Sequence, residues 1–134
     1  MKNVLFLIVI LAATVTAQLF ASLGNGEKEI AALYGDPISS GDADKNGVVT
    51  KKYQHGDYAI LVQFLSHHSL AESHTRTDLH EFSQEELSNL LRANSQGFEW
   101  KKNPRYQDWE RSDHHARAWC ETVAGRPTFL VHAK

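Results

Sequence analysis

The 134-residue sequence is poor in several residue types, and each shortage excludes a class of protein. Its single cysteine, Cys120, cannot form an internal disulfide framework or a multi-cysteine zinc site. Lysine and arginine number 14 against 16 aspartates and glutamates, so no excess of positive charge is present to hold nucleic acid. A hydrophobic fraction of 42% and a charged fraction of 22% are those of an ordinary globular domain, and they exclude collagen-like, coiled-coil and fully disordered chains.

Complete catalytic motifs are also missing from the sequence. The chain has no GxSxG segment for a serine-hydrolase elbow and no HExxH segment for a zinc protease. It contains neither a P-loop nor a GxGxxG segment, so it lacks the usual backbone cradles for nucleotides. These absences favour a protein without enzymatic activity and without a cofactor.

The first 17 residues have the three parts of a secretory signal peptide. Lys2 is their only charge, Val4–Ala13 is an unbroken apolar run, and small or β-branched residues at 15–17 precede Gln18. An uncleaved anchor is the alternative, but polar residues interrupt the stretch before it reaches the roughly 20 apolar residues of a membrane span. No cysteine lies near the cleavage point, which excludes a lipoprotein anchor. We expect export to the periplasm or the exterior of a bacterium, with no stable membrane span after cleavage.

Two segments of the remaining chain have the apolar spacing of helices. The first, Glu27–Tyr34, is expected to end at Gly35, where glycine supplies a left-handed residue. The second covers residues 82–97 and begins with a capping box of Ser83 and Glu86. The apolar stripes are Ile30, Leu33 and Tyr34 in the first helix and Leu87, Leu90 and Leu91 in the second.

Strand-like runs fill the rest of the chain, separated by turn residues. The run Tyr58–Leu65 is apolar on both faces and is expected to be a central strand. The predicted strands are 48–55, 58–65, 69–77, 98–102, 109–112, 116–123 and 128–132.

The order of these elements predicts an α+β fold class in a single domain of residues 18–134. Two helices would pack on one face of an antiparallel sheet, leaving the other face partly open. The elements would form two tandem helix-plus-strands units, with pseudo-repeats at about 27–78 and 83–134.

Two motifs resemble those of small exported bacterial proteins of unknown function, of the kind found in Verrucomicrobia. One is the YG.P helix ending at 34–37, and the other is segment 85–100, with paired glutamates, paired leucines, Ala93-Asn94, Gly97 and Trp100. More distantly, the chain is similar to the αβ repeats of the SmpA/BamE lipoproteins and of β-lactamase-inhibitor-like domains, which bind other proteins. The chain lacks the lipidated cysteine of those lipoproteins. The resemblance implies a protein-binding role and supplies no catalytic residues.

Two groups of residues are weak candidates for metal binding. Asp42, Asp44 and Asn46 match the opening of a calcium loop, but Tyr53 stands where a bidentate carboxylate is needed, so a polar turn is the alternative. Several of the eight histidines are candidates for a transition-metal site, with solvent-exposed turns as the alternative. These candidate histidines are His67, His68, His74, His114 and His115.

Cys120 and an aromatic stretch complete the candidates. Cys120 lies in a predicted strand. Three interpretations stay open for it: an inert thiol, an intermolecular disulfide partner, or a nucleophile paired with a histidine. Trp100, Arg105, Tyr106 and Trp109 are candidates for a binding surface, because tryptophan, tyrosine and arginine are enriched at interfaces. The alternative for this stretch is packing in the core.

The sequence as a whole predicts an exported, non-enzymatic binding or accessory protein of the bacterial envelope, whose partner is another envelope protein. Two other functions stay open. One is a histidine-mediated transition-metal-binding protein of the periplasm, and the other is a small enzyme that uses Cys120 or histidines.

Overall fold

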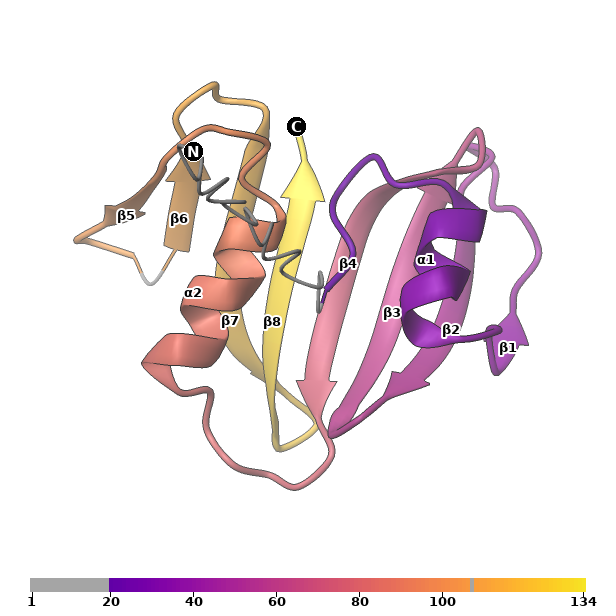
Figure 1. Ribbon diagram of the computed structural model, residues 1–134, viewed down its shortest axis with the longest axis horizontal. Helices are drawn as coiled ribbons and strands as arrows, with labels where there is room; N and C mark the ends of the chain where they lie inside the picture. The colour runs from indigo at the N-terminus through magenta and orange to yellow at the C-terminus, as the bar shows by residue number, and fades with distance from the viewer. Residues whose placement is uncertain (1–19, 107) are drawn as a thin grey trace, which may run out of the picture.

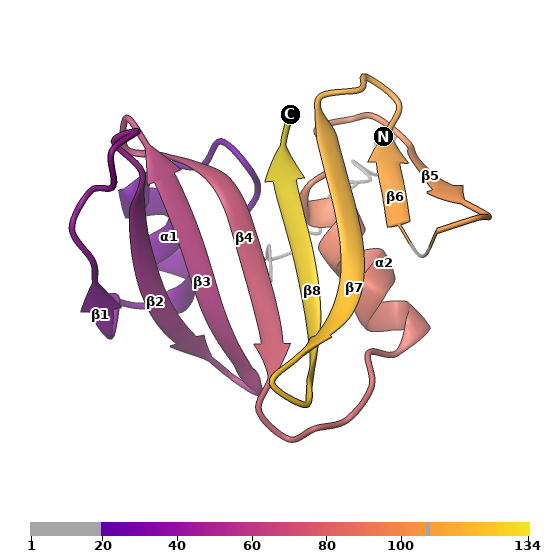
Figure 2. The same ribbon diagram turned by 180° about the vertical axis from the view of Figure 1, so that it is seen from behind.

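Within the part of the chain that the structure describes, eight strands join in one antiparallel sheet and two short helices lie on one side of it (Figures 1 and 2). This computed structural model describes residues 20–106 and 108–134, so the predicted signal peptide lies outside the described residues. The helices are α1 (Glu27–Tyr34) and α2 (Gln84–Ala93). The strands are β1 (Ser39–Ser40), β2 (Val49–His55), β3 (Tyr58–Leu65), β4 (His68–Arg76), β5 (Trp100–Asn103), β6 (Asp108–Arg111), β7 (Ala116–Val123) and β8 (Arg126–Ala133).

The strand order is β1-β2-β3-β4-β8-β7-β6-β5, so the last strand of the chain lies in the middle of the sheet. β4 and β8 pair antiparallel from Ala71 opposite His132 to Thr75 opposite Thr128. This pairing joins the four strands that precede α2 to the four that follow it. The sheet is therefore one continuous layer.

Alternation along the strands explains which side the helices cover. In β3, Ile60, Val62 and Phe64 are buried and belong to the core beneath α1. In β8, Phe129 and Val131 are buried in the core beneath α2. Residues two apart on a strand point to the same face, so one face is apolar and covered.

The helix ends follow the predicted local signals. The bounds of α1 are those predicted, and Gly35 follows it with a φ of 83°, a conformation that favours glycine. In α2, the Ser83 hydroxyl accepts a hydrogen bond from the Glu86 backbone N–H at 3.1 Å, which confirms the capping box. α2 is shorter than the predicted helix at 82–97 and ends at Ala93 before Asn94.

Residues 20–25, here called the strap, run between the two helices and across the centre of the sheet (Figure 1). The backbone N–H of Ala21 donates to the Tyr34 hydroxyl of α1 at 2.7 Å. The backbone N–H of Leu23 donates to Oδ1 of Asn94, directly after α2, at 2.9 Å. Ala21 packs in the core under α1, and Phe20 and Leu23 pack in the core under α2. The strap thus links the two halves of the core.

The predicted fold class, α+β with two tandem helix-plus-strands units, is wrong. Strands account for 45% of the described residues and helices for only 16%, so the protein has a mostly-β fold built on one eight-stranded sheet. The helical stripes are short. Ile30 and Tyr34 are the buried residues of α1, and Leu90 is that of α2. Strand-to-strand pairing, and not a helical layer, therefore dominates the architecture.

The expectation that Tyr58–Leu65 is a central strand is confirmed, because β3 pairs with β2 on one side and with β4 on the other. The bounds of β3 are those predicted, but Leu61 and Leu65 are 45% and 46% exposed. They lie on the face without helices, shown in Figure 2. An apolar outer face on a well-ordered strand indicates a surface that has a use other than the core.

Candidate functional site

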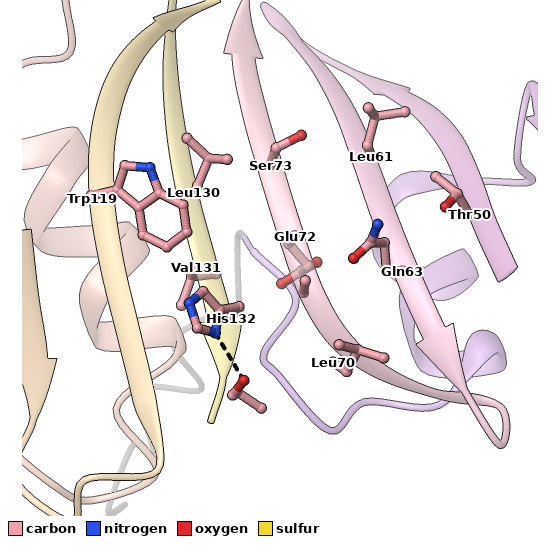
Figure 3. Close-up of a pocket in the computed structure, with 12 residues that line it drawn as sticks. Thr50, Leu61, Gln63, Leu70, Glu72, Ser73, Trp119, Leu130, Val131 and His132 are labelled. Atoms are coloured by element: carbon pink, nitrogen blue, oxygen red, sulfur yellow. Dashed lines mark hydrogen bonds between the residues drawn. The ribbon is translucent and has the colours of Figure 1, made fainter. Parts of the chain in front are cut away.

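A groove of about 440 Å³ lies on the uncovered face of the sheet, opposite the helices. Figure 3 shows the side chains that surround it, which come from five neighbouring strands from β2 to β7. The strand register places them in two adjacent rows across the sheet. One row is Trp119, Leu130, Ser73 and Leu61, and the other is His132, Ala71, Gln63 and Thr50.

Small residues in the middle of both rows form the floor of the groove. Ser73 and Ala71 of β4 stand between larger neighbours on β8 and β3, so the surface is lowest along β4. A register shift between β3 and β4 leaves Leu70 without a partner on β3, and Leu70 also lines the groove. Such bulges redirect side chains locally.

The walls of the groove are apolar and aromatic. Leu130 and Trp119 form one side and Leu61 the other (Figure 3). The Trp119 ring meets the His132 ring edge to face, with 5.2 Å between centroids. The Nδ1 atom of His132 lies 2.8 Å from the carbonyl oxygen of Ala133 and donates to it. These contacts hold the aromatic wall in a defined position before any partner arrives.

Charges on the β6–β7 side of the groove are paired with neighbours on the same face, whereas Lys52 of β2, opposite Leu61, is an exposed positive charge. Arg117, beside His132 in the sheet, donates from Nε to Asp108 at 2.8 Å. Glu110 is paired with His114 and with Nζ of Lys134. The apolar walls of the groove therefore favour an apolar occupant with a few hydrogen-bonding groups, and Lys52 adds a positive charge at the β2 edge.

The predicted aromatic candidates do not gather on one surface. Trp100 and Trp109 pack against the core under α2, and Nε1 of Trp100 donates to the carbonyl oxygen of Leu91 at 2.7 Å. Tyr106 is 60% exposed in the turn between β5 and β6, and the exposed Arg105 guanidinium lies 5.9 Å from its ring centroid. Trp119, and not this stretch, provides the aromatic surface on the sheet.

The predicted histidines occupy separate parts of the fold. His67 and His68 lie at the β3–β4 turn, where their Nδ1 atoms meet Glu27 at 2.9 Å and the Gly24 carbonyl oxygen at 3.0 Å. Of the other three candidates, His74 is buried under the strap, and His114 and His115 are exposed at the β6–β7 turn. Within residues 20–106 and 108–134, no group of three or more His, Cys, Asp or Glu side chains is arranged to hold a metal ion.

The calcium-like segment is a turn between β1 and β2. Oδ1 of Asp44 accepts hydrogen bonds from the backbone N–H groups of Asn46 and Val48 at 2.8 and 3.0 Å. Asp42 is exposed in the same segment. The Asp44 carboxylate therefore organises the backbone of the turn.

Cys120 is half-buried on the helix side of β7, at the edge of a crevice that Trp109 and Leu87 also line. Burial raises the pKa of its thiol to about 11. A nucleophilic cysteine needs the opposite, a stabilised thiolate. The geometry gives this thiol no activating partner among the described residues.

A second set of buried polar groups lies under the strap, on the covered face. Glu72 and His74 of β4 are 2% and 0% exposed. The Tyr34 hydroxyl lies 3.3 Å from Nε2 of His74. Burial raises the pKa of Glu72 to about 8, while burial and the nearby His55 lower the pKa of His74 to about 3.

The groove residues Trp119, Leu130 and His132 were not among the sequence candidates. A signal was present in β7, where small Ala116 and Ala118 alternate with the much larger Trp119. In a strand whose small residues face the core, a large aromatic residue on the other face indicates a surface role. Which face is covered depends on the β4–β8 pairing, and that pairing is not visible in local sequence patterns.

Comparison with protein-family models gave no match, and neither curated proteins nor solved structures gave a significant one. The resemblances drawn from the sequence therefore stay predictions. Neither helix in the described part of the chain is long and apolar enough to cross a membrane.

Proposed function

We propose that this chain is an exported, non-enzymatic binding protein of the bacterial envelope, and that the groove on its uncovered sheet face binds uncharged apolar side chains of a partner protein. The observation that carries the proposal is the pair of cross-strand rows around Ser73 and Ala71, which places Trp119, Leu130 and Leu61 around a hollow on an exposed surface. Aromatic anchors beside a pocket are typical of the energetic centres of protein interfaces.

A protein partner fits the groove better than a small molecule does. Small-molecule sites bury most of the ligand surface, commonly 70–90% or more. This groove has the sheet as its floor, and no helix or strand of the described chain covers it (Figure 2). A protein that lies across the sheet face would instead bury an area typical of stable complexes, about 800 Å² on each side.

Charge points to the chemistry of the partner surface. The Arg117–Asp108 pair and the Glu110 cluster leave little net charge on the β6–β7 side of the groove. A charged side chain seated between Trp119, Leu130 and Leu61 would lose its hydration against apolar walls. Leucine, valine or phenylalanine side chains on a neutral surface suit it.

The proposal of export rests on the signal-peptide pattern of residues 1–17, and cleavage after Ala17 is compatible with the fold. Phe20, which packs in the core, lies three residues after Ala17. Cleavage after Ala17 would leave every residue of the strap on the mature chain.

The groove itself is tested with the neutral apolar dye Nile red. Ser73→Leu fills the floor with a branched side chain and should weaken dye binding at least tenfold, because the hollow is lost. Gln54→Leu, on the same face of β2 but outside the groove, is the matched control and should bind as the original protein does. Equal dye binding by the two variants would contradict the groove as the apolar site.

The partner class is tested by cross-linking. A photoreactive phenylalanine at Leu61 is exposed to light in an envelope fraction of the source bacterium, and the same residue at Gln54 is the control. We expect a discrete protein adduct from position 61 that disappears when Trp119→Ala is added. Adducts of equal yield from both positions, or adducts unaffected by Trp119→Ala, would show that the groove does not hold the partner.

A further inference from the structure

The strap passes directly over Glu72. At one end, the Phe20 ring meets the His74 ring edge to face at 5.5 Å. At the other end, the Ser22 carbonyl oxygen accepts from the Ser69 hydroxyl at 3.1 Å, and Gly24 N–H donates to the Ser69 carbonyl oxygen at 2.8 Å. Ser69 and His74 flank Glu72 along β4, so the chain between Phe20 and Gly24 covers the Glu72 side chain. Figure 1 shows the strap in front of β4.

Glu72 is buried without a stabilising partner among residues 20–106 and 108–134. Neither of its carboxyl oxygens has a hydrogen-bond partner among the described residues. The residues paired with it on the neighbouring strands are Val62 of β3 and Val131 of β8, and both are apolar and buried. An ionised carboxylate there would lose its hydration without compensation, so the neutral acid is strongly favoured.

The other titratable groups near Glu72 come from α1, β2 and β4, whereas β3, β8 and the strap present uncharged residues to it. Tyr34 on α1 and Tyr53 on β2 interact electrostatically with Glu72, and His74 lies two residues away on β4. Glu27, Lys51 and His55 lie beyond these tyrosines: Glu27 acts on Tyr53, Lys51 pairs with Glu27, and the His55 ring meets that of Tyr34. Glu27 and Lys51 neutralise each other at 2.6 Å. Burial raises the pKa values of both tyrosines, so they stay neutral at moderate pH.

We propose that Glu72 is a proton-operated latch for the strap: the neutral carboxyl keeps residues 20–25 seated on the sheet, and its ionisation favours a state in which the strap is released while the sheet stays folded. Water must reach an ionised Glu72, and the strap is the easiest element to move. β4 is held by ladders on both sides, to β3 and β8, whereas the strap belongs to no ladder and is held by individual hydrogen bonds and by the packing of Phe20, Ala21 and Leu23.

The direction of the pH effect follows from linkage. The pKa of Glu72 is about 8 under the strap and 4.5 as an ordinary exposed carboxyl. Raising the pH between these values therefore favours release by up to tenfold per pH unit, and the effect levels off above about pH 8. His74 acts in the opposite direction below its ordinary value of 6.5, so the window from pH 6.5 to 8 isolates Glu72.

Hydrogen exchange of individual backbone amides tests the latch. The strap reporters are the N–H groups of Ala21 and Leu23, which donate to Tyr34 and Asn94. The reference is the N–H of Val131 in β8. Between pH 6.5 and 8, we expect the protection factors of the two strap amides to fall by up to tenfold per pH unit and to stay well below that of Val131, which exchanges only when the sheet opens.

Glu72→Gln is the matched variant, because the amide has the shape of the neutral acid and does not ionise. Its strap protection should be independent of pH. The latch is overturned by pH-independent strap protection in the original protein, by equal protection factors for the strap amides and Val131, or by the same fall in Glu72→Gln. If that variant does not fold, the comparison of Ala21 with Val131 in the original protein decides alone.

Discussion

On the covered side of β3, Ile60 is completely buried, while the next residue along the strand, Leu61, is 45% exposed on the other side. The same contrast runs across the middle of the sheet. Val131 packs in the core under α2, and its neighbour Leu130 lines the groove. Both faces of these strands are apolar, yet the helices and the strap cover only one of them.

Polar groups differ between the two faces in the same way. On the covered side, burial shifts the pKa values of Glu72 and His74 in opposite directions, because each loses hydration in its charged form. On the open side, Arg117 and Asp108 are paired at the surface. The covered face therefore determines stability and its pH dependence, whereas the open face can change with little cost to folding and is suited to recognition.

Substitution of Ile60 and Leu61 gives the largest contrast between the faces. Ile60→Ala leaves a cavity in the core and should lower the free energy of unfolding by about 2–5 kcal/mol. Leu61→Ala removes a similar side chain from the exposed face and should cost less than about 1 kcal/mol. Urea unfolding of the two variants measures the difference. Similar losses would mean that the open face is a second core.

The pH dependence of unfolding separates the two buried groups of the covered face. Glu72 has a raised pKa, so its contribution to stability falls as pH rises from 4.5 to about 8; His74 has a lowered pKa, so its contribution falls as pH drops from 6.5 to about 3. Between pH 4.5 and 6.5 the two slopes cancel. In Glu72→Gln, only the His74 slope is left, and stability should fall by up to about 1.4 kcal/mol per pH unit below 6.5.

Urea titrations of both proteins at pH 6.5, 5.5 and 4.5 measure this effect. The original protein is the control, and the gap between the two proteins should change with pH. A constant gap would mean that Glu72 binds the same number of protons in the folded and unfolded states.

Local signals in the sequence predicted the elements well. The bounds of α1, β3 and β7 are those predicted, because turn residues and clear periodicity mark their ends. The fold class was wrong because such signals carry no information on how many helical residues become buried or on the pairing of β4 with β8. That pairing joins residues far apart in the chain, such as Ala71 and His132.

The candidate groove could not be predicted from local sequence patterns for the same reason. Leu61 was identified as apolar, but the sequence could not show that its face is uncovered. The Trp119 and Leu130 walls meet Ser73 and Leu61 only through three successive strand pairings. The burial of Glu72 was likewise not predicted, because an acidic residue in a strand with many polar residues is normally on the surface.

Removal of the N-terminal cap of α2 should have a moderate effect on stability. Ser83→Ala deletes the acceptor of the Glu86 backbone N–H and should lower the free energy of unfolding by about 1 kcal/mol. Ser88→Ala, at an exposed position inside the same helix, is the control and should be neutral or slightly stabilising. Thermal or urea unfolding measures both. Equal effects would mean that the cap contributes nothing specific.

The smallest effect is expected for the aromatic pair on the open face. Trp119 and His132 are half-buried and meet edge to face, a geometry that contributes about 0.5–1.5 kcal/mol in aromatic pairs and less near the surface. A double-mutant cycle of Trp119→Ala and His132→Ala should give a coupling energy of about 0.5 kcal/mol in urea unfolding. A clear coupling together with small single losses would show that the groove wall is ordered in the free protein. Zero coupling would mean that the partner, and not the fold, positions Trp119, so that binding would require ordering of the wall.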